Sequence, residues 1–406
     1  MNDQQMKDPF DIVIVGAGMV GLTLATLLVE SEFAESLRVT VVDSGNEPRF
    51  DISADVDLRV SAISPGSAEI LSRAGVWQEI RSMRACPFVA MRVWDADGSV
   101  NGPETLRFDA ADFALADLGN IVENTLVQDR LLRRLAGHGQ RVQFGAKIHS
   151  VRGAGDRFLM TAADAAPVRP ELLIAADGSN SFVRTAAGIP LHAWRYAQSA
   201  FVTHVRPEQH HSDTAWQRFL RSGPIALLPL ADGRVSVVWS TSDELAGQAL
   251  AASDEELGRM LAQASDFVLG RLSPCGPRGS LALRAQYAAK YALPGLVLVG
   301  DAAHSVHPLA GQGANLGLAD AAVLTDMIGD ALARGEYPGD LPCLRRYERA
   351  RKGANQLMLR FIDSISGLFA SESATVSRLR GGGMRLFNHS GPVRRQVARV
   401  ALGLRR

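Results

Sequence analysis

The sequence predicts a mixed α/β fold (α+β in part), in which a parallel βαβ domain is interleaved with an antiparallel-sheet domain and followed by C-terminal helices. Short apolar runs that end at Gly or Asp occur at three separated places, 10–15, 172–176 and 296–299. Such runs are typical of buried parallel strands. Residues 196–240 instead form several short strand-like segments, separated by Gly, Pro and Asp turns. That pattern is typical of antiparallel strands.

Composition limits the class of protein. The chain has 406 residues, of which 47% are hydrophobic and 21% charged, which is enough for two or three domains with proper cores. Its 43 basic and 43 acidic residues cancel, so nothing favours nucleic acid as a partner. Cys86, Cys275 and Cys343 are widely spaced, as expected of free thiols in a reducing cytoplasm. With no run of eighteen apolar residues and no signal-like N-terminus, we expect a cytoplasmic protein that does not span a membrane.

The first strand, 10–15, leads directly into Gly16-Ala-Gly18-Met-Val-Gly21 and then into a helical pattern. This is the dinucleotide-binding fingerprint in its required context of strand, tight turn and helix. Gly16 permits the turn, Gly18 lets a pyrophosphate approach the helix N-terminus, and Gly21 lets the helix pack closely on the sheet. The sequence therefore predicts a Rossmann-like unit that binds a nucleotide, although such a unit without a ligand stays an alternative.

A second strand, 38–42, ends at Asp43, which lies 22 residues beyond Gly21. A carboxylate at this point is expected to hold a ribose with free hydroxyls. Further along, Arg59 suits a phosphate or an anionic ring, but a solvated surface arginine is an equal alternative. A helix is expected from Pro65 to Val76, with Ser64 as its N-cap.

The chain then enters strand-like segments over 88–121, and a helix follows from Glu123 and Asn124. A second buried strand ends at Asp177-Gly178. The carboxyl ends of parallel strands meet at one edge of a sheet, where α/β folds bind their ligands. Asp177 is therefore a candidate ligand-binding residue beside the glycine fingerprint.

Strands are expected near 201–205, 215–220, 224–230 and 235–239, followed by a helix over 253–264. An antiparallel sheet laid over a cofactor would form one wall of an apolar pocket. Candidate lining residues are Trp216, Phe219, Leu228 and Trp239, although ordinary core packing explains any one of them as well.

The segment 296–320 contains a strand, Asp301, a Pro308 turn, and a helix that opens on Gly311-Gln-Gly313-Ala314-Asn315. An aspartate leaving a strand can accept hydrogen bonds from a chain of hydroxyls. The free N–H groups of the helix start suit a ligand that carries negative charge. Glycines allow a flat ring to approach the backbone, so a reduced flavin fits, with Pro308 and Gly311 near its ring. An ordinary strand, turn and helix is the alternative.

Together these motifs resemble the FAD-dependent aromatic hydroxylases with the para-hydroxybenzoate hydroxylase fold, and within them the ubiquinone-biosynthesis hydroxylases. Further stretches that carry the resemblance are 58–64, 122–125 and 192–199. The resemblance implies that Asp43 contacts the adenosine ribose and that Arg59 lies near the phosphates. It also implies that Asn124 contacts FAD and that Asp301 holds the ribityl chain. The backbone from Gly311 through Gly313 and Ala314 to Asn315 would face the pyrimidine ring.

The cofactor-binding pieces at 11–43, 171–184 and 296–333 are separated by sheet-like insertions, so we expect interleaved domains. The FAD-binding domain would comprise 1–84, 122–184 and 285–334, and the β-sheet substrate domain 85–121 and 185–284. Residues 335–406 would form a C-terminal helical region with a basic tail.

The implied activity is hydroxylation, by O2 through a flavin hydroperoxide, of the ring of a polyprenylated phenol or benzoquinol in ubiquinone biosynthesis. The late step on a methoxy, methyl, polyprenyl benzoquinol is favoured, but other ring positions stay open. NAD(P)H or another donor would supply electrons. No metal is expected, since an iron site of His304, His307 and Asp301 conflicts with the flavin motif. A flavin reductase of prenyl double bonds, a halogenase and a non-catalytic binding or scaffold component are alternatives.

The tail from Ser373 to Arg406 contains eight arginines and no acidic residue, with apolar residues between them. A basic amphipathic segment suits the surface of an anionic bilayer in which a lipid substrate is dissolved. We therefore expect peripheral association with the inner membrane. A solvated helix, or a docking surface for an acidic partner such as another ubiquinone-biosynthesis protein, explains the same residues.

Overall fold

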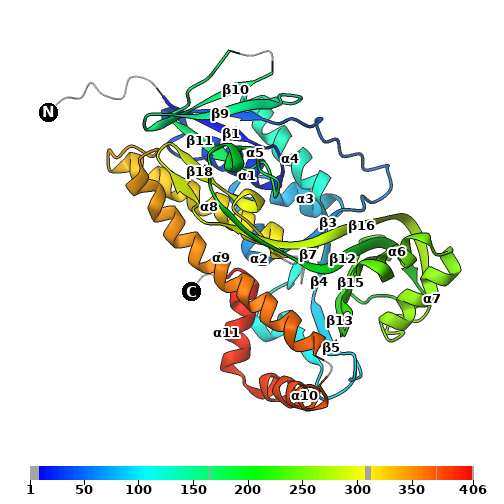
Figure 1. Cartoon of the computed structure of the whole chain (residues 1–406). Helices are drawn as coiled ribbons and strands as arrows, with labels where there is room; N and C mark the ends of the chain where they lie inside the picture. The colour runs from blue at the N-terminus through cyan, green and yellow to red at the C-terminus, as the bar shows by residue number, and fades with distance from the viewer. Residues whose placement is uncertain (1–8, 164–165, 307–311, 372, 405–406) are drawn as a thin grey trace.

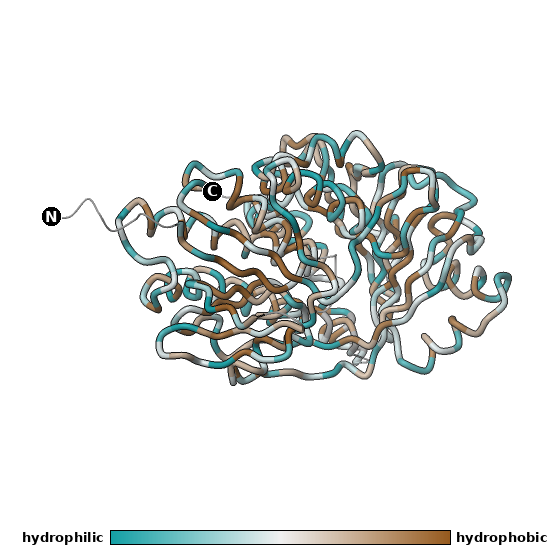
Figure 2. Tube along the Cα trace, turned by 90° about the horizontal axis from the view of Figure 1, so that it is seen from above, coloured by the Kyte–Doolittle hydropathy of each residue, from teal (hydrophilic) through white to brown (hydrophobic). Residues whose placement is uncertain are grey.

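The computed structural model describes residues 9–163, 166–306, 312–371 and 373–404. A six-stranded and an eight-stranded sheet form its two main parts, and helix α9 (Leu341–Ala370) extends from one part to the other (Figure 1). The more hydrophobic stretches gather inside each part and the hydrophilic turns at the periphery (Figure 2). No helix in the described ranges is both long and apolar enough to cross a bilayer.

The six-stranded sheet has the order β17–β18–β11–β1–β2–β8, and all its pairs are parallel except that of β17 with β18. Its strands are β1 (Phe10–Val15), β2 (Leu37–Val42), β8 (Val142–Gln143), β11 (Leu172–Ala175), β17 (Ala292–Leu293) and β18 (Leu296–Leu298). Strands β11 and β18 are apolar and buried along their whole length, as expected for parallel strands that are covered on both faces. The neighbouring helices are α1 (Met19–Val29), α4 (Asn124–Gly137) and α8 (Gln312–Ala333). The predicted α/β class is confirmed.

The eight-stranded sheet has the order β19–β16–β12–β15–β14–β13–β5–β6 and is antiparallel except between β13 and β5. Its strands are β5 (Ala90–Asp95), β6 (Leu106–Asp109), β12 (Leu191–Pro207), β13 (Thr214–Leu220), β14 (Gly223–Pro229), β15 (Val235–Ser242), β16 (Leu272–Ala288) and β19 (His304–Ser305). Helices α6 (Asp243–Ala251) and α7 (Asp254–Ala264) cover one face, with an apolar core between. The opposite face of β13 to β15 turns toward a cavity.

Smaller elements connect the two sheets. A three-stranded sheet consists of β3 (Val60–Ile63), β7 (Gly119–Glu123) and β4 (Cys86–Phe88), and β9 (Ile148–Ala154) pairs with β10 (Arg157–Ala162). The short helices are α2 (Pro65–Arg73), α3 (Trp77–Met83), α5 (Phe182–Ala186) and the 3-10 turns η1 (Ala34–Ser36), η2 (Ala110–Phe113) and η3 (Gly300–Ala302). Ser64 caps α2 as predicted, but the helix ends at Arg73, before Gly75, whose φ of +72° interrupts the helical backbone.

The basic tail folds back on the protein as α10 (Ala374–His389) and α11 (Pro392–Ala401) (Figure 1). Three of its arginines pair with acidic residues of the segment that contains β5, β6 and η2. The pairs are Arg380 with Asp95, Arg385 with Glu104, and Arg394 with Asp112. The Gly66 N–H of α2 donates to Leu402 O just beyond α11 at 3.1 Å. Much of the tail's positive charge therefore attaches it to the protein.

A buried carboxylate, Asp320 of α8, joins three elements. Its Oδ2 accepts from the Gly300 N–H at 3.0 Å and contacts His304 Nε2 at 2.5 Å. Its Oδ1 accepts from Arg351 Nε at 2.6 Å and from Asn355 Nδ2 at 3.2 Å. Burial alone would raise the pKa of Asp320, but the interactions with His304 and Arg351 outweigh it and lower this pKa to about 2.

Because the pKa of Asp320 is lower in the folded than in the unfolded chain, its ionised form stabilises the fold above about pH 4. This contribution, about 2 kcal/mol, is lost as the pH falls toward 2. We expect Asp320→Asn to be several kcal/mol less stable at neutral pH, since Arg351 loses its buried partner. Its stability should also fall less steeply between pH 4 and 2. Urea unfolding at a series of pH values measures both effects.

The matched control is Asp330→Asn, which removes an exposed carboxylate of the same helix, 3.9 Å from Arg334. An exposed pair contributes less than about 1 kcal/mol. Equal losses in the two variants would contradict the assigned role of Asp320.

Candidate functional site

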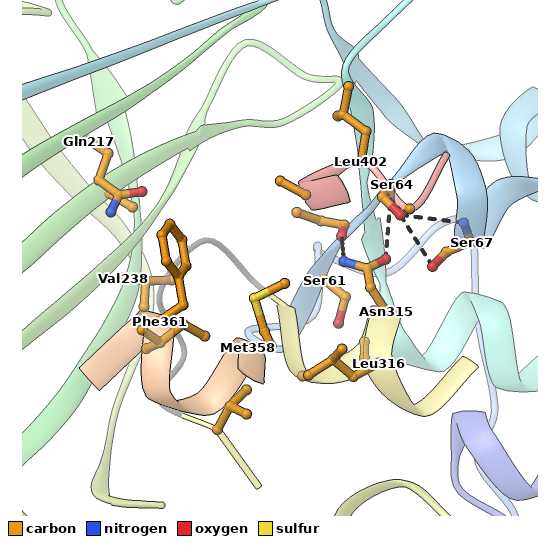
Figure 3. A pocket seen from close by; sticks show the side chains of 18 of the residues that line it. Ser61, Ser64, Ser67, Gln217, Val238, Asn315, Leu316, Met358, Phe361 and Leu402 are labelled. Atoms are coloured by element: carbon orange, nitrogen blue, oxygen red, sulfur yellow. Dashed lines mark hydrogen bonds between the residues drawn. The ribbon is translucent and has the colours of Figure 1, made fainter. Parts of the chain in front are cut away.

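A cavity of about 2250 Å³ is lined by both main parts of the fold and by the C-terminal helices. It is more than twice as large as the roughly 300–1,000 Å³ pockets that hold a drug-sized ligand. Serine and asparagine side chains lie on one side of the view in Figure 3, near Ser64 and Asn315, and apolar side chains from α9 lie on the other. The cavity therefore has room for a large polar ligand and an apolar one together.

The glycine fingerprint forms the turn between β1 and α1. A Cβ at Gly16, whose φ is +112°, would lie 2.2 Å from Ala176 O, and one at Gly21 would lie 2.0 Å from Gly16 O. Both glycines are thus required for close packing. Gly18 lines the cavity, and a Cβ there would meet no atom within 4 Å. The fingerprint therefore presents bare backbone to a ligand at Gly18, beside the start of α1.

Two strand-end carboxylates lie outside the cavity lining. Asp43 follows β2, and its carboxylate accepts hydrogen bonds from the Ala17 and Gly45 N–H groups, each at 2.6 Å. It thus lies against the fingerprint loop, at the open edge of the sheet. Asp177 was expected to face the ligand, but the structure turns its side chain toward α5, where it accepts from the Val183 N–H at 3.0 Å. The next residues, 178–180, line the cavity instead.

Asp301 and Arg59 place opposite charges on the cavity wall. Neither side chain forms a hydrogen bond with the described residues, and both are exposed to the cavity. The protein around Asp301 withholds bulk water, which raises the pKa of its carboxyl, while the charges of His304 and Arg59 oppose that rise. Asp301 therefore offers acceptor oxygens, and Arg59 offers a cation, to a ligand in the cavity.

The start of α8 forms the neighbouring wall. Gly313, Ala314 and Asn315 line the cavity, whereas Pro308 and Gly311 lie outside the described residues. The Asn315 amide accepts from the Ser64 N–H at 3.0 Å and donates to Ala62 O at 2.8 Å (Figure 3). These bonds hold the first turn of α8 against β3 and α2. The free N–H groups of that turn attract negative charge.

Asn124, at the start of α4, also lines the cavity. The Ser61 hydroxyl donates to its side-chain oxygen at 2.7 Å, and its backbone N–H donates to Arg59 O at 3.0 Å. The structure thus brings together Gly18, Arg59, Asn124, Asp301 and the start of α8, which lie far apart in the sequence.

Of the four predicted apolar pocket residues, Phe219 and Leu228 line the cavity. Trp216 reaches the cavity wall, but its ring packs edge-on against Trp94 and toward α6 and α7. The prediction for Trp239 was wrong, because its ring lies in the core under α6 and α7. Side chains alternate along a strand, so the adjacent Val238 faces the cavity instead.

Two kinds of lining residue were missed from the sequence. The first are apolar residues of α9, including Met358, Phe361 and Ile362. Their helical spacing was visible, but nothing indicated that this helix crosses the antiparallel sheet. The second is Gln217 of β13. Its position between Trp216 and Phe219 predicted a strand, but it did not predict on which face of the sheet the side chain lies.

The alternative iron site required His304 and His307 together with Asp301, and the structure describes one of these two histidines. His304 is buried and its Nε2 contacts Asp320, while His307 lies outside the described residues. His304 is therefore engaged in the buried network of α8.

Comparison with known proteins agrees with this geometry. The model of the FAD binding domain family matches residues 9–362. A 3-demethoxyubiquinol 3-hydroxylase from Escherichia coli is 35% identical over 98% of this chain and 100% of its own length. The ubiquinone hydroxylase UbiL of Rhodospirillum rubrum is 36% identical over 97% of this chain and 89% of its own. The mitochondrial ubiquinone biosynthesis monooxygenase COQ6 of Xenopus tropicalis is 32% identical over 97% and 93%.

Solved structures share the fold. The p-nitrophenol 4-monooxygenase PnpA of Pseudomonas putida has a TM-score of 0.77 at 19% identity, covering 98% of this chain and 99% of its own. HpxO of Klebsiella pneumoniae, solved with FAD and uric acid, has a TM-score of 0.74 at 18% identity over 97% of both chains. The family match over most of the sequence and the near full-length relatives show that the chain belongs to the FAD-binding domain family.

Proposed function

We propose that this protein hydroxylates the aromatic ring of a polyprenylated phenol or benzoquinol in ubiquinone biosynthesis, with FAD as cofactor and O2 as co-substrate. The observation that carries the proposal is the continuity of the cavity, which joins a polar, helix-start region to a long apolar chamber. The names of the relatives support the pathway. The Escherichia coli relative, similar over its full length, supports the late step on a demethoxyubiquinol-type ring.

The residues at the polar end fit FAD. Gly18 offers open backbone to a pyrophosphate at the start of α1, and Asp43 lies beside that loop for a ribose. The carboxylate of Asp301, which has no hydrogen bond with the described part of the chain, suits the ribityl hydroxyls, and Arg59 suits the phosphates. Gly313 has no atom within 4 Å of a Cβ position, so a flat ring could lie against the backbone. FAD, when bound, supplies the redox chemistry with O2.

The chain itself performs three tasks. Asn124 and Asn315 position the cofactor-binding backbone, and the N–H groups at the start of α8 stabilise negative charge beside them. The apolar walls from Phe219, Leu228 and α9 exclude water and hold the ring. We further propose that 85–121 and 185–284 act as the substrate part, and that 1–84, 122–184 and 285–334 act as the FAD-binding part.

The first test is Asp301→Asn. Loss of a charge-assisted acceptor should weaken FAD binding roughly 10- to 100-fold, so the variant should be purified with little flavin. The ratio of flavin to protein absorbance measures this, with the released chromophore identified by mass. Asp156→Asn, at an exposed turn, is the control.

An Asp301→Asn variant with normal flavin content would contradict the role of Asp301. A native protein that neither contains flavin nor takes up FAD would instead favour the non-catalytic scaffold as the function.

We also propose that the outer surface of the tail contacts an anionic membrane. Arg378, Arg395 and Arg399 are exposed and form no ion pair with the described residues. Exposed Leu386 and Val393 lie on the same helices. This combination of cationic and apolar groups suits the headgroup region of a bilayer that contains the lipid substrate.

Because α10 and α11 also line the cavity, point variants test this better than deletion. Replacing Arg395 and Arg399 with Gln should reduce binding to vesicles with anionic lipids by roughly 30-fold, at about 1 kcal/mol per arginine. The control replaces two exposed arginines with Gln, namely Arg141, which precedes β8, and Arg152 of β9. Strand β9 lies at the opposite end of the molecule from α11 (Figure 1). Equal binding by both double variants in a sedimentation assay would refute the membrane contact.

A further inference from the structure

The part of the cavity wall that β5, β13, β14 and β15 form is apolar except at one position. On strands β5, β13, β14 and β15, all fully described, the lining side chains are apolar apart from the Gln217 amide. Gln217 pairs in register with Ala226 of β14 and Val93 of β5, at the middle of this wall. Its strand neighbours Trp216 and Leu220 pack toward α6 and α7, so Gln217 points to the opposite side.

Gln217 is largely buried, and its amide faces the cavity. The residue is only 5% exposed, and no hydrogen bond of its side chain exists among the described residues. In the view of Figure 3, the labelled side chains next to the amide are those of Phe361 and Val238, which carry no polar atom. Gln286, which also lines the cavity, differs, since it donates to Ser179 O at 2.6 Å.

The amide atoms of Gln217 are accessible from the cavity and are not fully enclosed by protein. A ligand that displaces water from this apolar wall must therefore supply the amide with a hydrogen-bond partner, because an unsatisfied polar group is costly there. An amide offers two N–H donors and one acceptor oxygen, and it carries no charge. It can therefore donate to a methoxy or carbonyl oxygen, or accept from a phenolic hydroxyl.

The charged residues near Gln217 further restrict which ligands can bind there. Arg380 of α10 lines it, but its guanidinium pairs with the buried Asp95 and donates to Leu368 O at 2.9 Å. The cation is thereby neutralised. A ring carboxylate would have to lose its hydration beside a neutral amide and an already neutralised arginine, which is unfavourable.

We propose that Gln217 hydrogen-bonds an oxygen substituent of the substrate ring and that this wall selects an uncharged, oxygenated ring over a benzoate. This inference rests on the proposed function, because it takes the ligand of the apolar chamber to be an aromatic ring. Gln217 would determine which ring binds and in which orientation, and it would take no part in the bond-making step.

The test is binding of short-tailed probes to the oxidised, flavin-loaded protein, followed by the change in flavin absorbance. The parent probe is a 2-methoxyphenol with one isoprenyl group. Two further probes lack the hydroxyl or the methoxy group, and a fourth carries a carboxylate. Gln217→Met should weaken the parent probe about three- to tenfold, as expected for one hydrogen bond. The same substitution should leave unchanged the affinity for the truncated probe that lacks the oxygen to which Gln217 bonds.

Wild-type protein should bind the carboxylated probe at least tenfold more weakly than the parent. Because Met replaces an unpartnered amide in an apolar wall, the variant should be no less stable than the wild type in thermal unfolding. Gln217→Glu, which keeps the shape but not the N–H donors, serves as the second variant. Gln263→Met, at an exposed position of α7, is the matched control.

The possible results separate failure of the role of Gln217 from failure of the proposed function. Equal losses for the parent and both truncated probes, or no loss with any probe, would overturn the role of Gln217 while leaving the proposed function intact. Tight binding of the carboxylate by the wild type would overturn the selection for an uncharged ring. If the flavin-loaded wild type bound none of the probes, the proposed function itself would fail, and the inference would fall with it.

Discussion

The buried carboxylate of Asp320 is the interaction on which the rest of the site depends. It accepts the backbone N–H of Gly300 and, through Arg351 and Asn355, attaches α9 to α8. Gly300 directly precedes Asp301, and α9 forms a wall of the apolar chamber. One charged side chain thus positions both the polar and the apolar end of the cavity. Since leaving its cationic partner unpaired is costly, these elements are held together as a unit.

The cavity exists because two sheets with different surroundings meet. The parallel sheet is covered on both faces and offers its carboxyl edge, where backbone N–H groups and Asp301 are available to a polar ligand. The antiparallel sheet is covered by α6 and α7 on one face, which leaves the other face for an apolar ligand. The geometry suits chemistry in which a polar cofactor must meet an apolar substrate away from water.

The basic tail has a structural role in the folded chain, which its sequence alone did not indicate. As a sequence, the tail is a cationic amphipathic segment. In the folded chain, Arg380, Arg385 and Arg394 pair with acidic residues near β5 and β6, and the end of α11 bonds to α2 at Gly66. The tail therefore closes the cavity as well as presenting a surface. The same helices carry apolar residues that line the cavity, such as Met384 and Phe387, and exposed arginines, such as Arg395 and Arg399.

The sequence by itself determined the α/β class and the glycine turn between β1 and α1, because these depend on local periodicity and turn chemistry. Only the tertiary structure decided which side chains face the cavity. Trp239 and Val238 are adjacent and both apolar, and strand pairing alone sets which one turns inward. Asp177 and Asp301 both follow buried strands, yet one bonds to α5 and the other faces the cavity. The roles of Gln217 and α9 depend on contacts between segments more than a hundred residues apart, which no local pattern encodes.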